Sequence, residues 1–200
     1  LLGVFLKRPV GVDARIFDDV QTVDDVLDPA SVIHAIGMLG ARHGRPHRIL
    51  GILENAQEAL AAAREHYGVP GTDLETTVRF RDKGRMKEAL RAAGIPCAAH
   101  ARIEKPMDAL AFVKRVGFPI VLKPPDGAGC KATYRVDSRH ALEQALAQTR
   151  PSPSRPVLAE EFLTGEEFSF ETLTVGGEPR FYSISKYYPT PLEVMENDWL

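Results

Sequence analysis

The residues best suited to chemistry lie between Gly117 and Val136. A short apolar run, Ile120-Val121-Leu122, ends in Lys123, and a loop that contains Gly127 and Gly129 follows it. A buried strand that ends in a lysine delivers a positive charge to its tip, and glycines let backbone N–H groups approach an anion closely. The segment therefore predicts a binding site for a polyphosphate.

Two common phosphate-binding motifs can be tested against this loop. Gly127 to Ala132 fits the dinucleotide pattern G-x-G-x-x-A, which requires a helix directly after the glycines. Thr133 to Val136 is β-branched and aromatic and predicts a strand, so the next helix begins too late. The P-loop pattern G-x-x-x-x-G-K-[ST] does not occur. The remaining interpretation is a flap of strand, loop and strand. Its backbone N–H groups would cover the phosphates, and these are the N–H groups of Gly127, Ala128, Gly129 and Cys130.

Composition narrows the class of protein. A formal net charge of −2 with scattered charges argues against nucleic acid as a partner. No run approaches the roughly 18 apolar residues of a membrane span, and the opening LLGVFL is too short for a signal sequence. Two cysteines are too few for a disulfide framework, so a cytoplasmic location is expected. The histidines lack metal-ligand spacing, so we predict no metal site carried by the residues present.

The elements that must position the site begin with an alternation of strands and helices. Residues 1–72 are therefore expected to form the remnant of a small doubly wound α/β domain, with a boundary at Val69-Pro70-Gly71-Thr72. Its predicted elements are a buried strand Leu1–Leu6, an edge strand near Gln21–Val23, a helix from Asp28-Pro29 that closes at Gly40, a second buried strand Arg48–Leu53, and a helix Glu54–Tyr67 that ends at Gly68.

Beyond the boundary the pattern changes to α+β. Gly176-Gly177 between two alternating runs is typical of a tight hairpin turn. The predicted elements are a helix from Lys83 that is capped at Gly94, a weak strand Cys97–Ile103, a helix Pro106–Val116, the strands on either side of the glycine loop, a helix Ser138–Gln148, a strand Val157–Ala159 and the hairpin strands Phe168–Val175 and Arg180–Ser185.

Four segments in this order resemble the ATP-grasp superfamily, close to its carboxylate–amine ligases and biotin carboxylases. They are Arg81-Asp82-Lys83 with the helix that ends at Ala93-Gly94-Ile95-Pro96, the strand Gly117–Pro124 with its glycine loop, the segment Glu160-Glu161-Phe162-Leu163, and Glu167. Leu50 to Ala56 is also similar to the domain that precedes ATP-grasp in biotin carboxylase. The resemblance covers about Ile49 to Ile184.

The resemblance implies a nucleotide site with ATP and Mg²⁺ as cofactors. Lys83 and Lys123 would contact the phosphates, and the amides of Gly127 to Cys130 would cover them. Glu160, Glu161, Phe162 and Leu163 would form the hinge that receives adenine, and Glu167 would bind the ribose hydroxyls. The loop departs from many relatives, since Cys130 and Ala132 stand where those carry Ser and Gly.

The implied fold has three parts. Residues 1–72 would be the domain before ATP-grasp, 73–156 the first lobe with the glycine flap, and 157–200 the start of an incomplete second lobe. The family's metal-binding acid and Asn pair and its late Arg are expected beyond Leu200, so no catalytic residue is assigned here. Residues 1–200 alone are therefore expected to be inactive.

The implied activity is ligation. An ATP- and Mg²⁺-dependent enzyme would activate a small-molecule carboxylate as an acyl phosphate for attack by an amine. Two alternatives stay open: a biotin-carboxylase-like carboxylation that uses bicarbonate, and an ATP-binding sensor or scaffold without catalysis. A homodimer is the default assembly, because two-fold dimers are the commonest soluble oligomers.

Several of these residues also have a plain structural interpretation. Lys83 could be a solvated surface lysine, Lys123 could extend to water from a strand end, and the glutamates from Glu160 to Glu167 could form an acidic surface. Glu54 follows a predicted strand, so it either faces a substrate or begins its helix as a favourable N-terminal acid.

Overall fold

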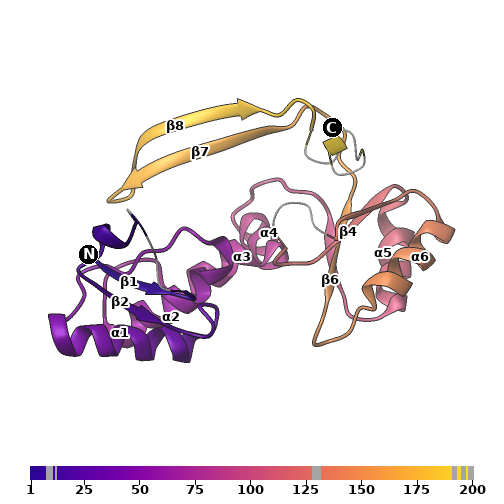
Figure 1. Cartoon of the computed structure of the whole chain (residues 1–200). Coiled ribbons are helices and arrows are strands. Elements are labelled where there is room, and N and C mark those ends of the chain that lie inside the picture. Colours follow the sequence, from indigo (N-terminus) through magenta and orange to yellow (C-terminus); the bar gives the residue numbers. More distant parts are fainter. Residues whose placement is uncertain (8–10, 12, 128–131, 191–192, 195–196, 198–200) are drawn as a thin grey trace. The chain divides into compact units, whose positions relative to one another are not determined.

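The computed structural model describes residues 1–7, 11, 13–127, 132–190, 193–194 and 197. Contacts between residues divide the chain into two compact units, Leu1–Met86 and Lys87–Leu200, and each is described by itself (Figure 1). The division falls inside helix α4 (Lys83–Ala92). Among the described residues, no helix has both the length and the apolar character needed to cross a bilayer.

The first unit contains a two-stranded parallel sheet. Strand β1 (Leu2–Phe5) pairs with β2 (Asp19–Thr22), and Leu2 lies opposite Asp19. The short 3₁₀ helix η1 (Asp13–Ile16) lies in the connection. Both predicted strands are confirmed, although Leu1 and Leu6 at the ends of the first run are exposed.

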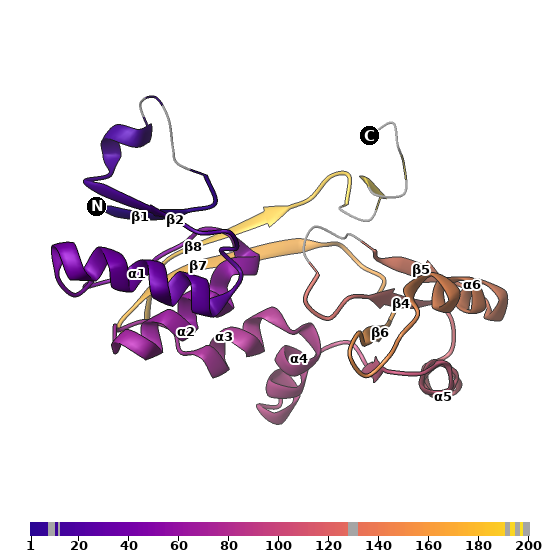
Figure 2. The same cartoon turned by 60° about the horizontal axis from the view of Figure 1, so that its bottom comes forward.

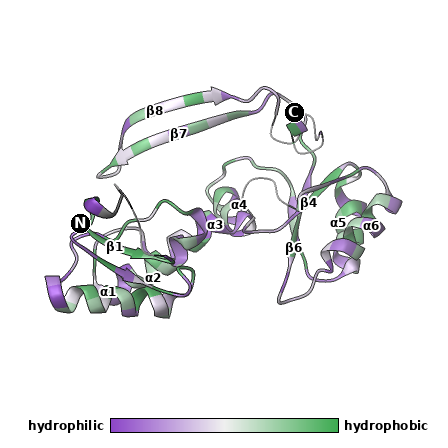
Figure 3. Ribbon diagram, in the orientation of Figure 1, coloured by the Kyte–Doolittle hydropathy of each residue, from purple (hydrophilic) through white to green (hydrophobic). Residues whose placement is uncertain are grey.

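Helix α1 (Pro29–His43) begins where the sequence predicts, because the Asp28 carboxylate accepts hydrogen bonds from the N–H groups of Ala30 and Ser31. The predicted end at Gly40 is wrong. A glycine inside a helix costs only about 1 kcal/mol, and the helix continues to Gly44, where φ is +84°. Hydrophobic and hydrophilic residues alternate along α1 (Figure 3), and its apolar side packs on the next helix.

The predicted helix from Glu54 consists of the 3₁₀ turn η2 (Glu54–Ala56) and helix α2 (Gln57–Tyr67). It ends at Gly68 in the left-handed conformation, as predicted. A further helix, α3 (Leu74–Arg81), was not predicted, although Asp73 caps it by accepting from the Thr76 N–H. Helix α3 packs against α2, within the first unit.

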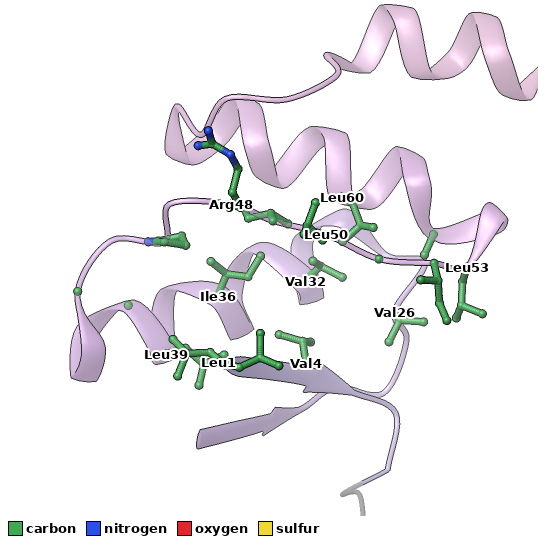
Figure 4. Close-up of a pocket in the computed structure, with 18 residues that line it drawn as sticks. Leu1, Val4, Val26, Val32, Ile36, Leu39, Arg48, Leu50, Leu53 and Leu60 are labelled. Carbon is green, nitrogen blue, oxygen red and sulfur yellow. The ribbon is translucent and has the colours of Figure 1, made fainter. Parts of the chain in front are cut away.

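The predicted strand Arg48–Leu53 is wrong. The segment forms no strand pairing with any described residue, and only Ile49 is buried, whereas Leu50 is 85% and Ile52 is 100% exposed. An extended segment forms a β-strand only where its backbone N–H and C=O groups hydrogen-bond to those of a neighbouring strand. Here it borders an apolar cavity of about 330 Å³ beside β1 and α1 (Figure 4). Within the described residues, the sheet of the first unit has two strands, β1 and β2, and lacks the second buried strand that the sequence predicted for it.

The second unit is built on a four-stranded antiparallel sheet in the order β3-β6-β4-β5. The strands and the helices α5 and α6 are found where the sequence predicts them, but β3 begins at His100 rather than Cys97, and β6 continues through Glu160 and Glu161. The bounds are β3 (His100–Ile103), α5 (Pro106–Val116), β4 (Ile120–Lys123), β5 (Tyr134–Val136), α6 (Arg139–Thr149) and β6 (Val157–Glu161).

The two faces of this sheet differ in chemistry, because side chains alternate along each strand. On one face, Ile120, Leu122 and Ala159 belong to a buried core that α5 and α6 cover (Figure 2). Phe112 of α5 and Leu142 of α6 complete that core. The residues between these apolar positions point to the opposite face, which carries the polar side chains described below.

A hairpin follows the sheet. Strand β7 (Phe168–Val175) pairs with β8 (Glu178–Lys186), and Gly176 and Gly177 form the turn with φ of +61° and +82°. Two successive positive φ values define the hairpin turn predicted from the sequence. Most side chains of both strands are exposed among the described residues.

Candidate functional site

The central feature of the polar face is an ion pair between two neighbouring strands. Lys123 Nζ at the end of β4 lies 2.7 Å from Glu160 Oε2 on β6. In the β4–β6 register Val121 is opposite Glu160 and Lys123 is opposite Leu158, so the two charged side chains are diagonal neighbours on one face. The strand that delivers the predicted phosphate lysine therefore holds it against a carboxylate.

A second lysine approaches the same carboxylate. Lys87 Nζ of α4 lies 3.5 Å from Glu160 Oε1. Glu160 is 7% exposed, and its Oε1 accepts no hydrogen bond within the described part of the chain. Two ammonium groups surround one carboxylate, so this triad carries a net positive charge. Such an arrangement suits an additional anion.

His100 and Arg91 lie beside this triad. His100 lies directly opposite Glu160 on β3, and its Nδ1 is 3.2 Å from an Arg91 Nη of α4. Because the guanidinium can only donate, the neutral ring accepts at Nδ1 and carries its proton on Nε2. Burial, followed by the charge of Arg91, lowers the pKa of His100. We name Lys87, Arg91, His100, Lys123 and Glu160 the Glu160 cluster.

The lowered pKa of His100 predicts a loss of stability in acid. Below about pH 6.5 the unfolded chain binds a proton that the folded ring resists, so stability falls as the pH falls toward the folded pKa. One group contributes at most about 1.4 kcal/mol per pH unit. Urea midpoints measured from pH 7 to pH 5 should fall less steeply for His100→Gln than for the unchanged chain. His140→Gln, at an exposed position on α6, should retain the full slope; equal slopes for all three proteins would contradict this role.

The predicted hinge residues occupy the end of β6 and the segment after it. Glu161 is engaged with the backbone before β3, since its carboxylate accepts from the Ala99 N–H at 2.7 Å and its N–H donates to the Ala99 carbonyl at 2.9 Å. The Phe162 N–H donates to the Pro119 carbonyl at 3.3 Å, and the Arg135 guanidinium lies 4.4 Å from the centre of the Phe162 ring. Leu163 and Glu167 are both exposed.

The glycine loop is described only at its edges. Gly127 is described, whereas Ala128, Gly129 and Cys130 lie outside the described residues. On the far side, Ala132 has φ of +53°, a conformation that costs a residue with a Cβ on the order of 1 kcal/mol. Glycine adopts this conformation without that cost, so an alanine at position 132 carries a conformational cost that a glycine would not.

Lys83 is the first residue of α4 and belongs to the first unit, so its role stays a prediction. Sequence reasoning missed Lys87, Arg91 and His100. A signal for two of them was available, because Lys83, Lys87 and Arg91 follow at steps of four residues, the spacing of one helix face. Within the described residues, no three His, Cys, Asp or Glu side chains gather as a metal site.

Comparison with known proteins relates this geometry to a family. Residues 81–198 match the model of the phosphoribosylglycinamide synthetase ATP-grasp (A) domain. An L-arginine-specific L-amino acid ligase of Bacillus subtilis is 30% identical over 176 residues, which cover 85% of this chain and 42% of that protein.

Two solved structures share the fold. The L-amino acid ligase from Bacillus licheniformis has a TM-score of 0.74 at 19% identity, over 95% of this chain and 51% of that one. The biotin carboxylase domain of the Hydrogenobacter thermophilus 2-oxoglutarate carboxylase, in complex with MgADP, ADP and bicarbonate, has a TM-score of 0.62 at 18% identity, over 84% and 45%.

The chain thus spans about half the length of these relatives. The family match covers more than half of the chain, includes both predicted lysines and contains the whole Glu160 cluster. The fold is the mixed α/β fold that the ATP-grasp structures share. The chain belongs to the ATP-grasp superfamily.

Proposed function

We propose that this chain is the nucleotide-binding part of an ATP- and Mg²⁺-dependent ligase that joins a carboxylate to an amine, with amino acids as substrates. The observation that carries the proposal is the Glu160 cluster, in which two lysines face one buried carboxylate. The similarity to an L-amino acid ligase over 85% of the chain supports the substrate class.

The phosphates of ATP would lie on the cationic side of this cluster. Lys123 and Lys87 would share their charge between Glu160 and the phosphate oxygens, and Lys83 would join them from the same helix face as Lys87. The amides of Gly127 to Cys130 would cover the phosphates from the flap. Bound Mg²⁺ would neutralise phosphate charge, and no residue of this chain is assigned as its ligand.

Adenine would lie beside the end of β6. The buried Oε1 of Glu160 is an acceptor to which an amino group of the base can donate. The N–H groups of Glu161 and Phe162 already donate to the carbonyls of Ala99 and Pro119, so the next backbone N–H, that of Leu163, would contact the base. Glu161 would contribute its backbone carbonyl, because its carboxylate and its N–H are both engaged with Ala99. The exposed Glu167 is free of such bonds in the described part of the chain and would accept from the ribose hydroxyls.

We also propose the finer domain assignment. Residues 1–72 correspond to the domain before ATP-grasp, 73–156 to the first lobe with its flap, and 157–200 to the start of the second lobe. The hairpin β7–β8 would begin that second lobe. A cytoplasmic location and a homodimer remain the expectations for the whole protein.

The proposed reaction predicts where one oxygen atom goes. A carboxylate oxygen attacks the γ-phosphorus of ATP and ADP leaves; the amine nitrogen then attacks the acyl carbon, and phosphate leaves with that oxygen. Full-length protein given ATP, Mg²⁺ and L-amino acids labelled with ¹⁸O in the carboxylate should release phosphate with one ¹⁸O. Mass spectrometry of the phosphate measures this.

Other outcomes separate the alternatives. Unlabelled phosphate released only with bicarbonate would favour carboxylation. MgATP binding without phosphate release across the amino-acid panel would favour a sensor or scaffold, and either result would contradict the ligase.

A further inference from the structure

The first unit contains a cationic site of its own. A cleft of about 510 Å³ lies between the segment Arg48–Glu54, helix α2, the turn after it and helix α3. Three arginines line it, Arg48, Arg64 and Arg81, and Glu54 is the one carboxylate among its described lining residues. The cleft therefore carries a surplus of positive charge.

Arg64 forms the floor of this cleft. It is 8% exposed, and its Nε and Nη1 donate to the carbonyls of Thr72 and Ile49, both at 3.1 Å. Gly71 permits this placement, since a Cβ there would lie 2.5 Å from Arg64 Cδ. The turn after α2 thus has a residue without a side chain where the arginine passes.

Arg81 and Arg48 form the sides. Arg81 Nη1 lies 2.5 Å from Glu54 Oε1, and the Arg81 side chain is 10% exposed against 59% for Glu54. Arg48 is exposed, and Figure 4 shows its side chain pointing away from the apolar residues Ile36 and Leu39. No described carboxylate lies within ion-pair distance of Arg48 or Arg64.

Two exposed apolar side chains also line this cleft. Leu50 is 85% and Phe80 is 75% exposed, and both line the cleft beside the arginines. A bare phosphate or sulfate would make no use of these side chains. A ligand with a carboxylate at one end and an apolar group at the other matches both features, because guanidinium groups bind carboxylates by paired hydrogen bonds and apolar walls gain from burial.

We propose that this cleft binds an amino acid that has an apolar side chain, with its carboxylate on Arg48 and Arg81 and its side chain on Leu50 and Phe80. The inference rests on the proposed ligase function and names a substrate class for it. Glu54 acts as an internal competitor, because its carboxylate occupies Arg81 when the ligand is absent.

The test is a calorimetric titration of the 200-residue chain with L-phenylalanine, and with L-phenylalaninamide, which lacks the carboxylate. The acid should bind at least about tenfold more tightly than the amide, the scale of one charge-assisted hydrogen bond. Arg48→Gln should weaken binding of the acid by about tenfold. Glu54→Gln should tighten it, because a competing carboxylate is removed. Arg79→Gln is the matched control, since Arg79 lies on the same helix, pairs with Glu75 and does not line the cleft.

Equal affinity for acid and amide, or an equal loss in Arg79→Gln and Arg48→Gln, would overturn the inference. So would weaker binding of the acid to Glu54→Gln. Thermal stabilisation by MgATP is measured on the same samples. If MgATP stabilises the chain and L-phenylalanine fails to bind, the cleft assignment falls and the nucleotide site stands; if L-phenylalanine binds and MgATP does not, the proposed function falls.

Discussion

Replacing Lys123 with methionine is expected to lower the free energy of unfolding by about 3 kcal/mol, the scale for removing one partner of a buried ion pair. The Glu160 side chain is 10% exposed and, among the described residues, would keep Lys87 as its one cationic partner, with its Nζ 3.5 Å away. Methionine preserves the apolar stem, so the loss reflects the charge left without its nearest partner. Urea denaturation followed by circular dichroism measures it.

A second substitution tests the cause. Lys123→Met combined with Glu160→Gln removes both charges of the pair and should recover most of the lost stability. Arg139→Met is the matched control, because Arg139 pairs with Glu143 at 3.2 Å on the surface of α6. An exposed pair of this kind contributes about 0.5 kcal/mol or less. If Lys123→Met lowered the free energy of unfolding no more than Arg139→Met does, the ion pair between Lys123 and Glu160 would not stabilise the fold.

The sequence predicted best those elements whose ends carry their own signals. Asp28 begins α1, Gly68 ends α2 and Ser138 caps α6, and each acts through local backbone hydrogen bonds or a left-handed conformation. The hairpin turn at Gly176-Gly177 is likewise a property of two adjacent residues. Such features depend on a few neighbouring positions, so a local pattern contains them.

Elements that depend on distant partners were harder to predict. The run Arg48–Leu53 has the composition of a buried strand, but strand structure requires a hydrogen-bonding neighbour, which the pattern of a single segment cannot reveal. Helix α3 was missed for the opposite reason: its Asp73 cap was present, but its apolar spacing is weak.

In the site, too, local features could be predicted and contacts between distant residues could not. Lys123 was identified from its own strand and loop, and Glu160 from the segment that contains it. Their direct pairing arises from the order β3-β6-β4-β5, which places β6 between β3 and β4. The sequence contained the spacing of Lys87 and Arg91 on α4, but only the fold shows which face of that helix meets Glu160.

The second large effect concerns nucleotide affinity. In a chain that carries Glu160→Gln, adding Lys123→Met is expected to weaken MgATP binding on the order of 100-fold, the range of one or two charge-assisted hydrogen bonds to phosphate. The comparison starts from Glu160→Gln because Glu160 is the one carboxylate within ion-pair distance of Lys123 among the described residues. In that background, the loss of Lys123 reports on its contact with the phosphates.

An equilibrium titration of MgATP into the 200-residue chain tests the central claim most directly. The proteins are the unchanged chain, Glu160→Gln, Glu160→Gln with Lys123→Met, and Arg139→Met. We predict that Arg139→Met binds like the unchanged chain and that the double variant binds far more weakly than Glu160→Gln. Equal MgATP affinity for Glu160→Gln and the double variant, with both folded, would contradict a phosphate site at Lys123.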